Sequence, residues 1–176
     1  MDNLVTYTVD NSDICTTMSN VKVVDGKMDW RTDVYYKKLK DDAKVPTQGS
    51  TAAAGYDLYS LESDGLIEIA PHTTVKVGTG IAIELPYNTF GAIFARSGLA
   101  TKQGLRPANC VGVVDSDYRG EVIVALHNDT DEIKSIEGGD RIAQLVVMPY
   151  VPVRFTEKEE LTDTVRGDGG FGSTGA

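Results

Sequence analysis

The stretch "VKVGTGIAIEL", residues Val75–Leu85, decides the fold class of this chain. Apolar or β-branched side chains fall at every second position, namely Val75, Val77, Thr79, Ile81, Ile83 and Leu85. A period of two is typical of a strand with one buried face. On the other face, Gly78 and Gly80 indicate a β-bulge or the close approach of another backbone. The stretch therefore predicts a half-buried β-strand.

Similar short runs follow one another along the chain, and turn-forming residues separate them. They cover residues 33–39, 66–70, 91–95, 121–127 and 141–153. Helical periodicity is nearly absent. One short helix is expected in "SGLATKQG", with Ser97 as its N-cap and Gly104 at its end. Many short strands at this spacing indicate an all-β sandwich, barrel or jelly roll.

The composition suits one globular domain and limits its partners. The chain has 176 residues, of which 41% are hydrophobic, enough for a single core. Its 17 basic and 26 acidic residues give a net charge of −9, which argues against binding nucleic acid. A few arginines can still create a local site for a small anion. No apolar run approaches the roughly 18 residues of a membrane span, so no membrane partner is expected.

Cysteine usage indicates the cellular compartment. Cys15 and Cys110 are typical of a reduced cytoplasmic protein, although a disulfide between them stays open. There is no CxxC spacing and no histidine cluster that would indicate a metal site. The start "MDNLVTYTVD" lacks the basic and apolar regions of a signal peptide. We therefore expect a cytoplasmic protein.

The first 30 residues differ in character from the rest. "NLVTYTV" and "VKVVDGK" are compatible with two extra strands, the second ending in a "DG" turn, or with a mobile leader. The compact domain is expected to begin in "MDWRTDVYYKKL". We therefore divide the chain into an extension of residues 1–30, a domain of residues 31–160 and a glycine-rich arm of residues 161–176.

The arm ends in "RGDGGFGSTGA", in which five of eleven residues are glycine. It matches GxGxxG, yet no βαβ unit surrounds it, and Ser173 stands where a P-loop has lysine. One interpretation is a disordered tail. The other is a flap that becomes ordered over a phosphorylated ligand. In that case Ser173, Thr174 and backbone N–H groups hold phosphate, Arg166 adds a forked donor, and Phe171 stacks on a flat ring.

Two stretches in the middle of the chain offer an anion site and a general base. "ARSGLA" places Arg96 and Ser97 where a strand meets a helix start, which favours an anion unless the two are only a surface charge and a cap. "NCVGVVDSDYRGEVIV", which begins at Asn109, predicts a β-hairpin with a type I turn at "DYRG". Asp115 at its mouth can accept a proton, although Asp115 and Asp117 are also compatible with ordinary turn acids.

Two further stretches are less informative alone. "AAAGYDLYS" contains Asp57, and "GDRIAQLV" contains Gln144. Gln144 lies in an apolar strand, so it needs hydrogen-bond partners if it is buried. We interpret the neighbours Asp140 and Arg141 as a structural ion pair.

Taken together and in order, five stretches resemble the trimeric dUTPase family. They are "AAGYDLYS", "ARSGLA", "GVVDSDYRGEV", "GDRIAQLV" and "RGDGGFGSTG". The resemblance runs from about Val34 to the C-terminus and leaves out the first 30 residues. It implies an all-β jelly-roll (β-clip) fold with one short helix, a homotrimer, and Mg²⁺-dependent hydrolysis of dUTP to dUMP and pyrophosphate. Ala95 departs from the proline of many relatives, which should be tolerable.

The resemblance also implies residue roles at the nucleoside end. Asp115 binds the deoxyribose 3′-hydroxyl and activates water as a general base. Tyr118 packs against the deoxyribose and excludes a 2′-hydroxyl. The backbone at Val113 and Val114, with Asn109 nearby, reads the uracil edge.

At the phosphate end, the resemblance implies a site shared between subunits. Asp57 supports this site or contacts the metal through water, while Mg²⁺ is bound mainly by the substrate phosphates. The residues that hold phosphate are Arg96, Ser97, Gly98 and Gln144. A third subunit's arm then closes over the substrate with Arg166, Phe171, Gly172, Ser173 and Thr174.

Two other function classes stay open beside the enzyme. The same trimer can act as a nucleotide-sensing module that controls a protein partner, and such a role can coexist with catalysis. A related dCTP deaminase is disfavoured, because the chain lacks the extra glutamate context expected for it.

Overall fold

Almost all regular structure is β-strand in the computed structural model, which describes residues 22–24, 27–29 and 32–170. The helical segments of this part are two short turns, η1 (Glu62–Asp64) and η2 (Leu99–Gln103). The strands are β1 (Lys22–Val24), β2 (Lys27–Asp29), β3 (Tyr35–Lys38), β4 (Thr47–Gln48), β5 (Tyr56–Tyr59), β6 (Leu66–Ile69), β7 (Thr74–Glu84), β8 (Thr89–Phe94), β9 (Leu105–Pro107), β10 (Gly112–Asp115), β11 (Glu121–Asn128), β12 (Lys134–Glu137) and β13 (Arg141–Pro149). None of its helical segments is long and apolar enough to cross a membrane.

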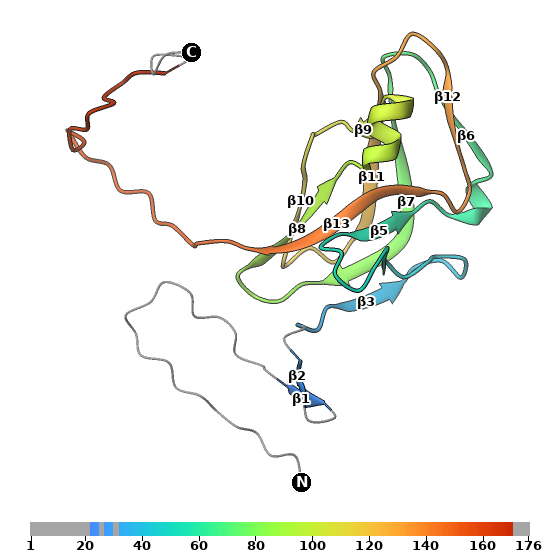
Figure 1. Cartoon of the computed structure of the whole chain (residues 1–176), viewed down its shortest axis with the longest axis horizontal. Coiled ribbons are helices and arrows are strands. Elements are labelled where there is room, and N and C mark those ends of the chain that lie inside the picture. Colours follow the sequence, from blue (N-terminus) through green and yellow to red (C-terminus); the bar gives the residue numbers. More distant parts are fainter. Residues whose placement is uncertain (1–21, 25–26, 30–31, 171–176) are drawn as a thin grey trace.

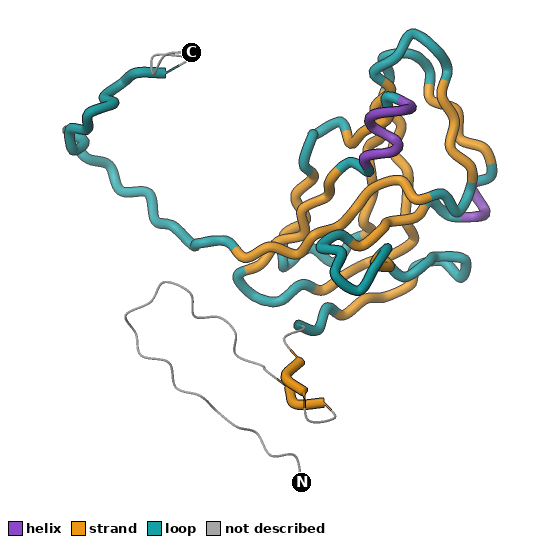
Figure 2. The backbone as a smooth tube through the Cα atoms, viewed as in Figure 1, coloured by secondary structure: helices purple, strands orange, loops and turns teal. Residues whose placement is uncertain are grey.

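Two antiparallel sheets form a jelly-roll sandwich (Figures 1 and 2). One sheet has the order β10-β8-β13-β5-β4, and the other has the order β3-β7-β11-β9. The short pair β12-β6 extends one end of the molecule. From β7 to β11, consecutive strands alternate between the two large sheets. The all-β prediction is therefore confirmed, and each connection in this region crosses from one layer to the other.

The core lies between the two sheets and follows the predicted alternation. In β7, Val77, Ile81 and Ile83 are buried, and Thr79 on the same face is buried as well. Facing side chains from the other sheet, such as Ile142, complete one continuous cluster. Each fully buried aliphatic side chain contributes about 1.5–3 kcal/mol, so this cluster is the main source of stability.

The bulge expected in β7 is present beside the first residues of β11. The register of the β7–β11 pairing shifts between Glu121 and Ile123. Gly80 has φ of +65°, and a Cβ there would lie 2.7 Å from Cδ2 of Leu61. The Gly80 N–H donates to Oε1 of Glu121 at 2.7 Å. Gly78 leaves room for the same carboxylate, since a Cβ there would lie 2.6 Å from Oε1.

The domain begins with an edge strand. β3 pairs with β7, and all four of its residues are exposed, so the strand predicted in "DVYYKKL" is confirmed. Before it, β1 and β2 pair antiparallel with Val24 opposite Lys27, which favours the strand interpretation of "VKVVDGK". "NLVTYTV" lies outside the described residues.

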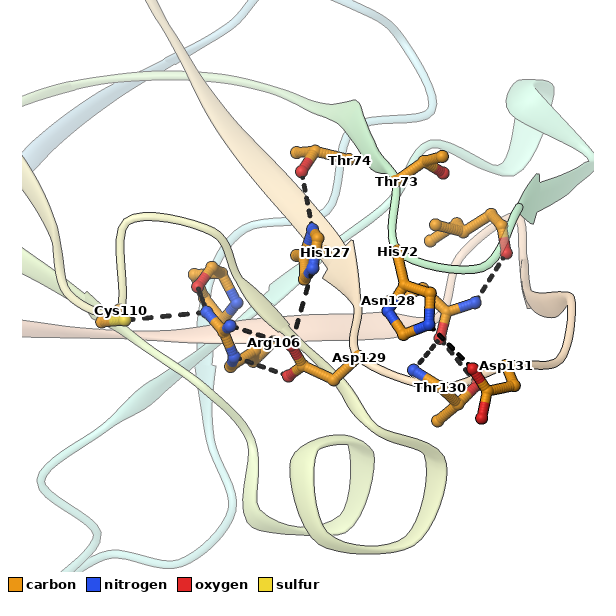
Figure 3. Close-up of polar contacts among 12 residues, drawn as sticks. His72, Thr73, Thr74, Arg106, Cys110, His127, Asn128, Asp129, Thr130 and Asp131 are labelled. Carbon is orange, nitrogen blue, oxygen red and sulfur yellow. Dashed lines mark hydrogen bonds and ion pairs between the residues drawn. The ribbon is translucent and has the colours of Figure 1, made fainter.

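A polar network closes one end of the second sheet, where β9 meets β11 (Figure 3). Arg106 donates from Nε and Nη2 to the two carboxylate oxygens of Asp129, at 2.6 and 2.9 Å. His127 lies 3.5 Å from the same carboxylate and shares a 2.9 Å hydrogen bond with Thr74. Arg106 also donates to Sγ of Cys110 at 3.6 Å. The network thus ties the strand end to the segment that leads into β10.

Replacing Gly80 with alanine should lower the free energy of unfolding by about 2–4 kcal/mol, because a Cβ adds positive-φ strain and overlaps packed side chains. Urea unfolding measures the change. Gly49→Ala is the matched control, since nothing lies within 4 Å of its added Cβ. That control should change stability by about 0.5 kcal/mol or less. Equal effects of the two substitutions would contradict the account of the bulge.

The Asp129 network predicts a stability difference that depends on pH. The hydrogen bond from Arg106 lowers the pKa of the Asp129 carboxyl below its ordinary value. A lowered pKa contributes stability above the unfolded value of roughly 3.9, and this is lost as pH falls through the folded pKa. Asp129→Asn should therefore melt below the wild type at pH 6, and the gap should shrink below about pH 4.

Melting temperatures from pH 7 to about 2.5 would measure this gap. Asp131→Asn is the matched control, because Asp131 is an almost fully exposed carboxylate whose partner is the exposed His72. It should shift the melting temperature little at any pH. A gap for Asp129→Asn that stays constant down to the lowest pH would contradict the assignment.

Candidate active site

A buried carboxylate organises the end of the first sheet. Asp57 in β5 is 4% exposed and lies opposite Gln144 of β13. Its Oδ1 accepts from Nε of Arg96 at 2.9 Å and from Nε2 of Gln144 at 3.4 Å. Its Oδ2 accepts from Nη1 of Arg141 at 3.3 Å. The structure therefore brings together Asp57, Arg96 and Gln144, which come from three different stretches of sequence, and supplies the partner that Gln144 needed.

The predicted Asp140–Arg141 pair is wrong. Arg141 is turned toward Asp57, while the Asp140 carboxylate accepts the backbone N–H of Glu137 at 2.9 Å and closes the turn before β13. Neighbouring side chains at the start of a strand point to opposite faces, so adjacency in sequence keeps them apart. Arg141 is thus a cationic residue of the candidate site that sequence analysis assigned elsewhere.

The helical turn η2 begins differently from the prediction. Gly98 occupies the N-cap position and no side chain caps the turn, so Ser97 is not its cap. The Ser97 carbonyl accepts the Thr101 hydroxyl at 2.6 Å, and the exposed Ser97 hydroxyl has no partner in the described part of the chain. Gly104 does end the turn, with φ of +68° and its N–H bonded to the Leu99 carbonyl. Ser97 and Gly98 are therefore free to meet a ligand next to Arg96.

The residues around Asp115 form a crossing between sheets and not the predicted hairpin. β10 pairs with β8, placing Asp115 opposite Phe90, whereas β11 pairs with β7 and β9. The tight turn runs from Asp115 to Tyr118, whose N–H donates to the Asp115 carbonyl at 3.1 Å. The chain crosses layers here, as it does at the other connections from β7 to β11. Asp115 and Tyr118 are consequently exposed at the rim of the sandwich.

A shallow pocket of about 210 Å³ gathers the residues predicted to hold the nucleoside. Its lining includes Asn109, Val113, Val114, Asp115 and Tyr118. A larger hollow of about 870 Å³ lies on the other side of the turn and shares only Val113 and Asp115 with it. The smaller pocket is the better candidate for a base and sugar, because backbone edges and an aromatic face converge there.

The group around Asp57 and the residue Asp115 lie beside opposite ends of strand β8. Gln144 is opposite Phe94 at one end of β8, and Asp115 is opposite Phe90 near the other. Four residues of strand span roughly 13 Å. One chain therefore does not place its own Arg96 and Gln144 beside its own Asp115.

The arm lies outside both groups. Arg166 is exposed and donates from Nε to the Gly169 carbonyl at 2.8 Å. The chain beyond β13 extends away from the sandwich (Figure 1). Phe171, Gly172, Ser173 and Thr174 lie outside the described residues.

Two further residues near the turn were missed by sequence analysis. Arg119 donates from Nη1 to the carbonyls of Ser116 and Tyr118, at 2.7 and 3.0 Å. Glu121 accepts from Gly80 in the bulge. The two glycines of β7 were the available signal, because small residues in a strand imply a neighbour that fills their space. Among the described residues, no group of three or more His, Cys, Asp or Glu side chains is arranged to hold a metal ion.

Comparison with known proteins agrees with the geometry. The family model of dUTPase matches residues 41–175. The deoxyuridine 5′-triphosphate nucleotidohydrolase of Desulfitobacterium hafniense (strain DSM 10664 / DCB-2) is 51% identical over 146 residues, which are 82% of this chain and 96% of that protein.

Solved structures resemble the fold. The Staphylococcus bacteriophage 80alpha dUTPase with dUPNHPP has a TM-score of 0.75 and 26% identity, covering 83% of this chain and all of that one. A mutant dUTPase from phage phi11 of S. aureus, with a structural Mg(II) ion, has a TM-score of 0.65 and 22% identity, covering 73% of this chain and 98% of that one. At 22% identity, the similarity to the phage phi11 dUTPase shows the fold alone. With the family model and a close relative both spanning the sandwich and its two groups of polar residues, the chain belongs to the dUTPase family.

Proposed function

We propose that this chain hydrolyses dUTP to dUMP and pyrophosphate by attack of water on the α-phosphorus. The observation that carries the proposal is the exposed turn that places Asp115 and Tyr118 together at a pocket of about 210 Å³. The relative from D. hafniense, named for dUTP hydrolysis, supports the same activity. Removal of dUTP keeps uracil out of DNA and releases dUMP for dTMP synthesis.

The nucleoside end of the site selects the base and sugar of the substrate and activates the attacking water. Asp115 binds the 3′-hydroxyl and takes a proton from the attacking water, a contribution of about 10²–10⁴-fold for a positioned base. The exposed ring of Tyr118 packs against the deoxyribose. Backbone groups of Val113 and Val114 pair with the uracil edge, and Asn109 lines the same pocket.

The phosphate end supplies fixed positive charge. Arg96 and Arg141 share one carboxylate, so the group around Asp57 keeps one net positive charge for a phosphate. Gln144, Ser97 and Gly98 add neutral donors beside it. Donors held in place before the reaction stabilise the charge that develops on the phosphate oxygens and on pyrophosphate.

Mg²⁺ fits this site as an ion that is bound by the substrate triphosphate. Both oxygens of Asp57 already accept hydrogen bonds, so Asp57 serves better as an anchor for Arg96 than as a metal ligand. The three phosphates would then supply most of the ligands, and Mg²⁺ would neutralise part of their charge when bound.

The proposed assembly is a homotrimer with shared active sites. The roughly 13 Å between the two groups of residues supports sharing, since a neighbour must bring Arg96 and Gln144 to Asp115. Exposure of Val151, Val153 and Phe155, which alternate with polar residues or proline between β13 and the arm, supports docking of this connecting segment on another subunit. Arg166, Phe171, Gly172, Ser173 and Thr174 then close over a neighbour's substrate.

The remaining parts of the proposal concern the division of the chain, its cellular location and a protein partner. We keep the division into residues 1–30, 31–160 and 161–176, with regular strands ending at Pro149. A cytoplasmic location rests on the sparse cysteines, and a regulatory protein partner for the extension stays compatible with catalysis.

Pyrophosphate release with Mg²⁺ from dUTP, dTTP, dCTP and UTP in parallel tests the activity. We expect release from dUTP alone, because Tyr118 excludes the 2′-hydroxyl and the backbone edge at Val113 and Val114 excludes the 5-methyl and amino groups. Asp115→Asn should still bind nucleotide but lose about 10²-fold or more in kcat. A rate near that of the wild type would remove Asp115 from the role of base. No release from any of the four would leave a binding site only.

Deleting residues 166–176 should lower kcat/KM for dUTP by about 10²-fold, because the deletion removes donors for the γ-phosphate and the lid over uracil. Size-exclusion chromatography should still show the trimer, since residues 166–170, the part of the deleted segment that the structure describes, contribute nothing to the core. A truncated monomer would instead assign the arm to assembly.

A further inference from the structure

The side chain of Tyr118 is held by one hydrogen bond. Its hydroxyl donates to the carbonyl of Glu121 at 3.0 Å, and no other partner exists among the described residues. The ring folds back over Gly120, where an added Cβ would collide with the Tyr118 hydroxyl. The orientation of the ring therefore depends on where the backbone of Glu121 lies.

The backbone of Glu121 is paired with Ala82 of β7, and its carboxylate adds a second link to the same strand. Oε1 accepts the Gly80 N–H inside the β7 bulge at 2.7 Å. Gly80 is itself wedged against Leu61, and Gly78 leaves the space that the carboxylate occupies. The next residue is tied to the same bulge, since the buried Thr79 hydroxyl donates to the Val122 carbonyl at 2.7 Å. The side chain of Glu121 thus reinforces the connection between the core strand and the carbonyl that holds the ring of Tyr118.

We propose that Glu121 is a positioning residue that sets the preference for deoxyribose over ribose, acting through Tyr118. The proposal rests on the proposed function, in which Tyr118 packs against the sugar. Packing rejects one extra hydroxyl only if the ring is held to a fraction of an ångström, because repulsive contacts change steeply with distance. A ring released from the Glu121 carbonyl can tilt away and leave room for the 2′-hydroxyl.

The second contact between this turn and β7 acts differently. Arg119 lies 3.6 Å from Glu84 through Nη2 and holds the backbone carbonyls of Ser116 and Tyr118. It makes no hydrogen bond to the Tyr118 ring hydroxyl. Glu84 is therefore a matched control for Glu121. It is also a glutamate, and it lies on the neighbouring strand β7. Its contact with Arg119 does not involve the ring of Tyr118.

The test compares Glu121→Ala, Glu121→Gln, Tyr118→Phe, the double variant Glu121→Ala/Tyr118→Phe and Glu84→Gln. For each, the ratio of kcat/KM for dUTP to that for UTP is measured, with dissociation constants for dUMP and UMP and the melting temperature. The ratio should fall about five- to tenfold in Glu121→Ala, the usual effect of one lost hydrogen bond. Glu121→Gln should lose less, because its amide oxygen can still accept the Gly80 N–H.

Tyr118→Phe should lower the ratio as much as Glu121→Ala, and the double variant should fall no further, because both changes break one connection. Glu84→Gln should keep the wild-type ratio. An unchanged ratio in Glu121→Ala, with a lowered melting temperature, would make Glu121 a purely structural residue and overturn the proposal. Additive losses in the double variant would overturn it too. If the wild type hydrolyses none of the nucleotides, the dUTPase proposal fails separately, and the dUMP and UMP affinities still decide the role of Glu121.

Discussion

The arrangement of the residues around Asp57 depends on one buried charge. A carboxylate out of water is strongly destabilising unless it is paired and hydrogen-bonded, and Asp57 is 4% exposed. Three donors from the segment after β8 and from β13 satisfy it, so their side chains are held in one arrangement. Because Asp57 must be neutralised, Arg96 and Gln144 are held in place before any ligand binds. A cation held in this way needs no rearrangement when charge develops on a phosphate.

The turn that carries Asp115 and Tyr118 depends on topology instead. β10 and β11 belong to different sheets, so the chain between them must leave the core and cross the rim of the sandwich. A crossing turn exposes its side chains, which explains why Asp115 and Tyr118 meet solvent while Val114 and Val122 on either side are buried. The β7 bulge gives this exposed turn a fixed support through Glu121. Exposure and rigidity are thus combined in one short segment.

The strands could be read from the sequence because alternation follows directly from burial on one face, and Gly78 and Gly80 marked the bulge for a steric reason. The errors share one cause, which is reliance on neighbours in sequence. Asp140 and Arg141 looked like a pair, Ser97 looked like a cap, and "DYRG" looked like a hairpin turn. For Arg141 and for β11 a partner distant in sequence decided the outcome: Arg141 pairs with Asp57, and β11 pairs with β7 in the other sheet. Pairing across layers cannot be read from local pattern alone.

The separation of the two ends has a consequence for the arm. Because β8 is a rigid core strand, its ends cannot approach each other, and in the proposed function a substrate that touches both kinds of residue lies between chains. In the proposed trimer, a third contribution then has to reach a site that no single subunit completes. A glycine-rich segment suits this task, since its high conformational entropy opposes ordering until a ligand supplies contacts. In the proposed trimer, the length of the exposed chain after Pro149 provides the reach, and its exposed apolar residues provide the docking contacts. The proposed closure over the substrate is then the event that assembles the site, which ties water exclusion to the presence of the correct nucleotide.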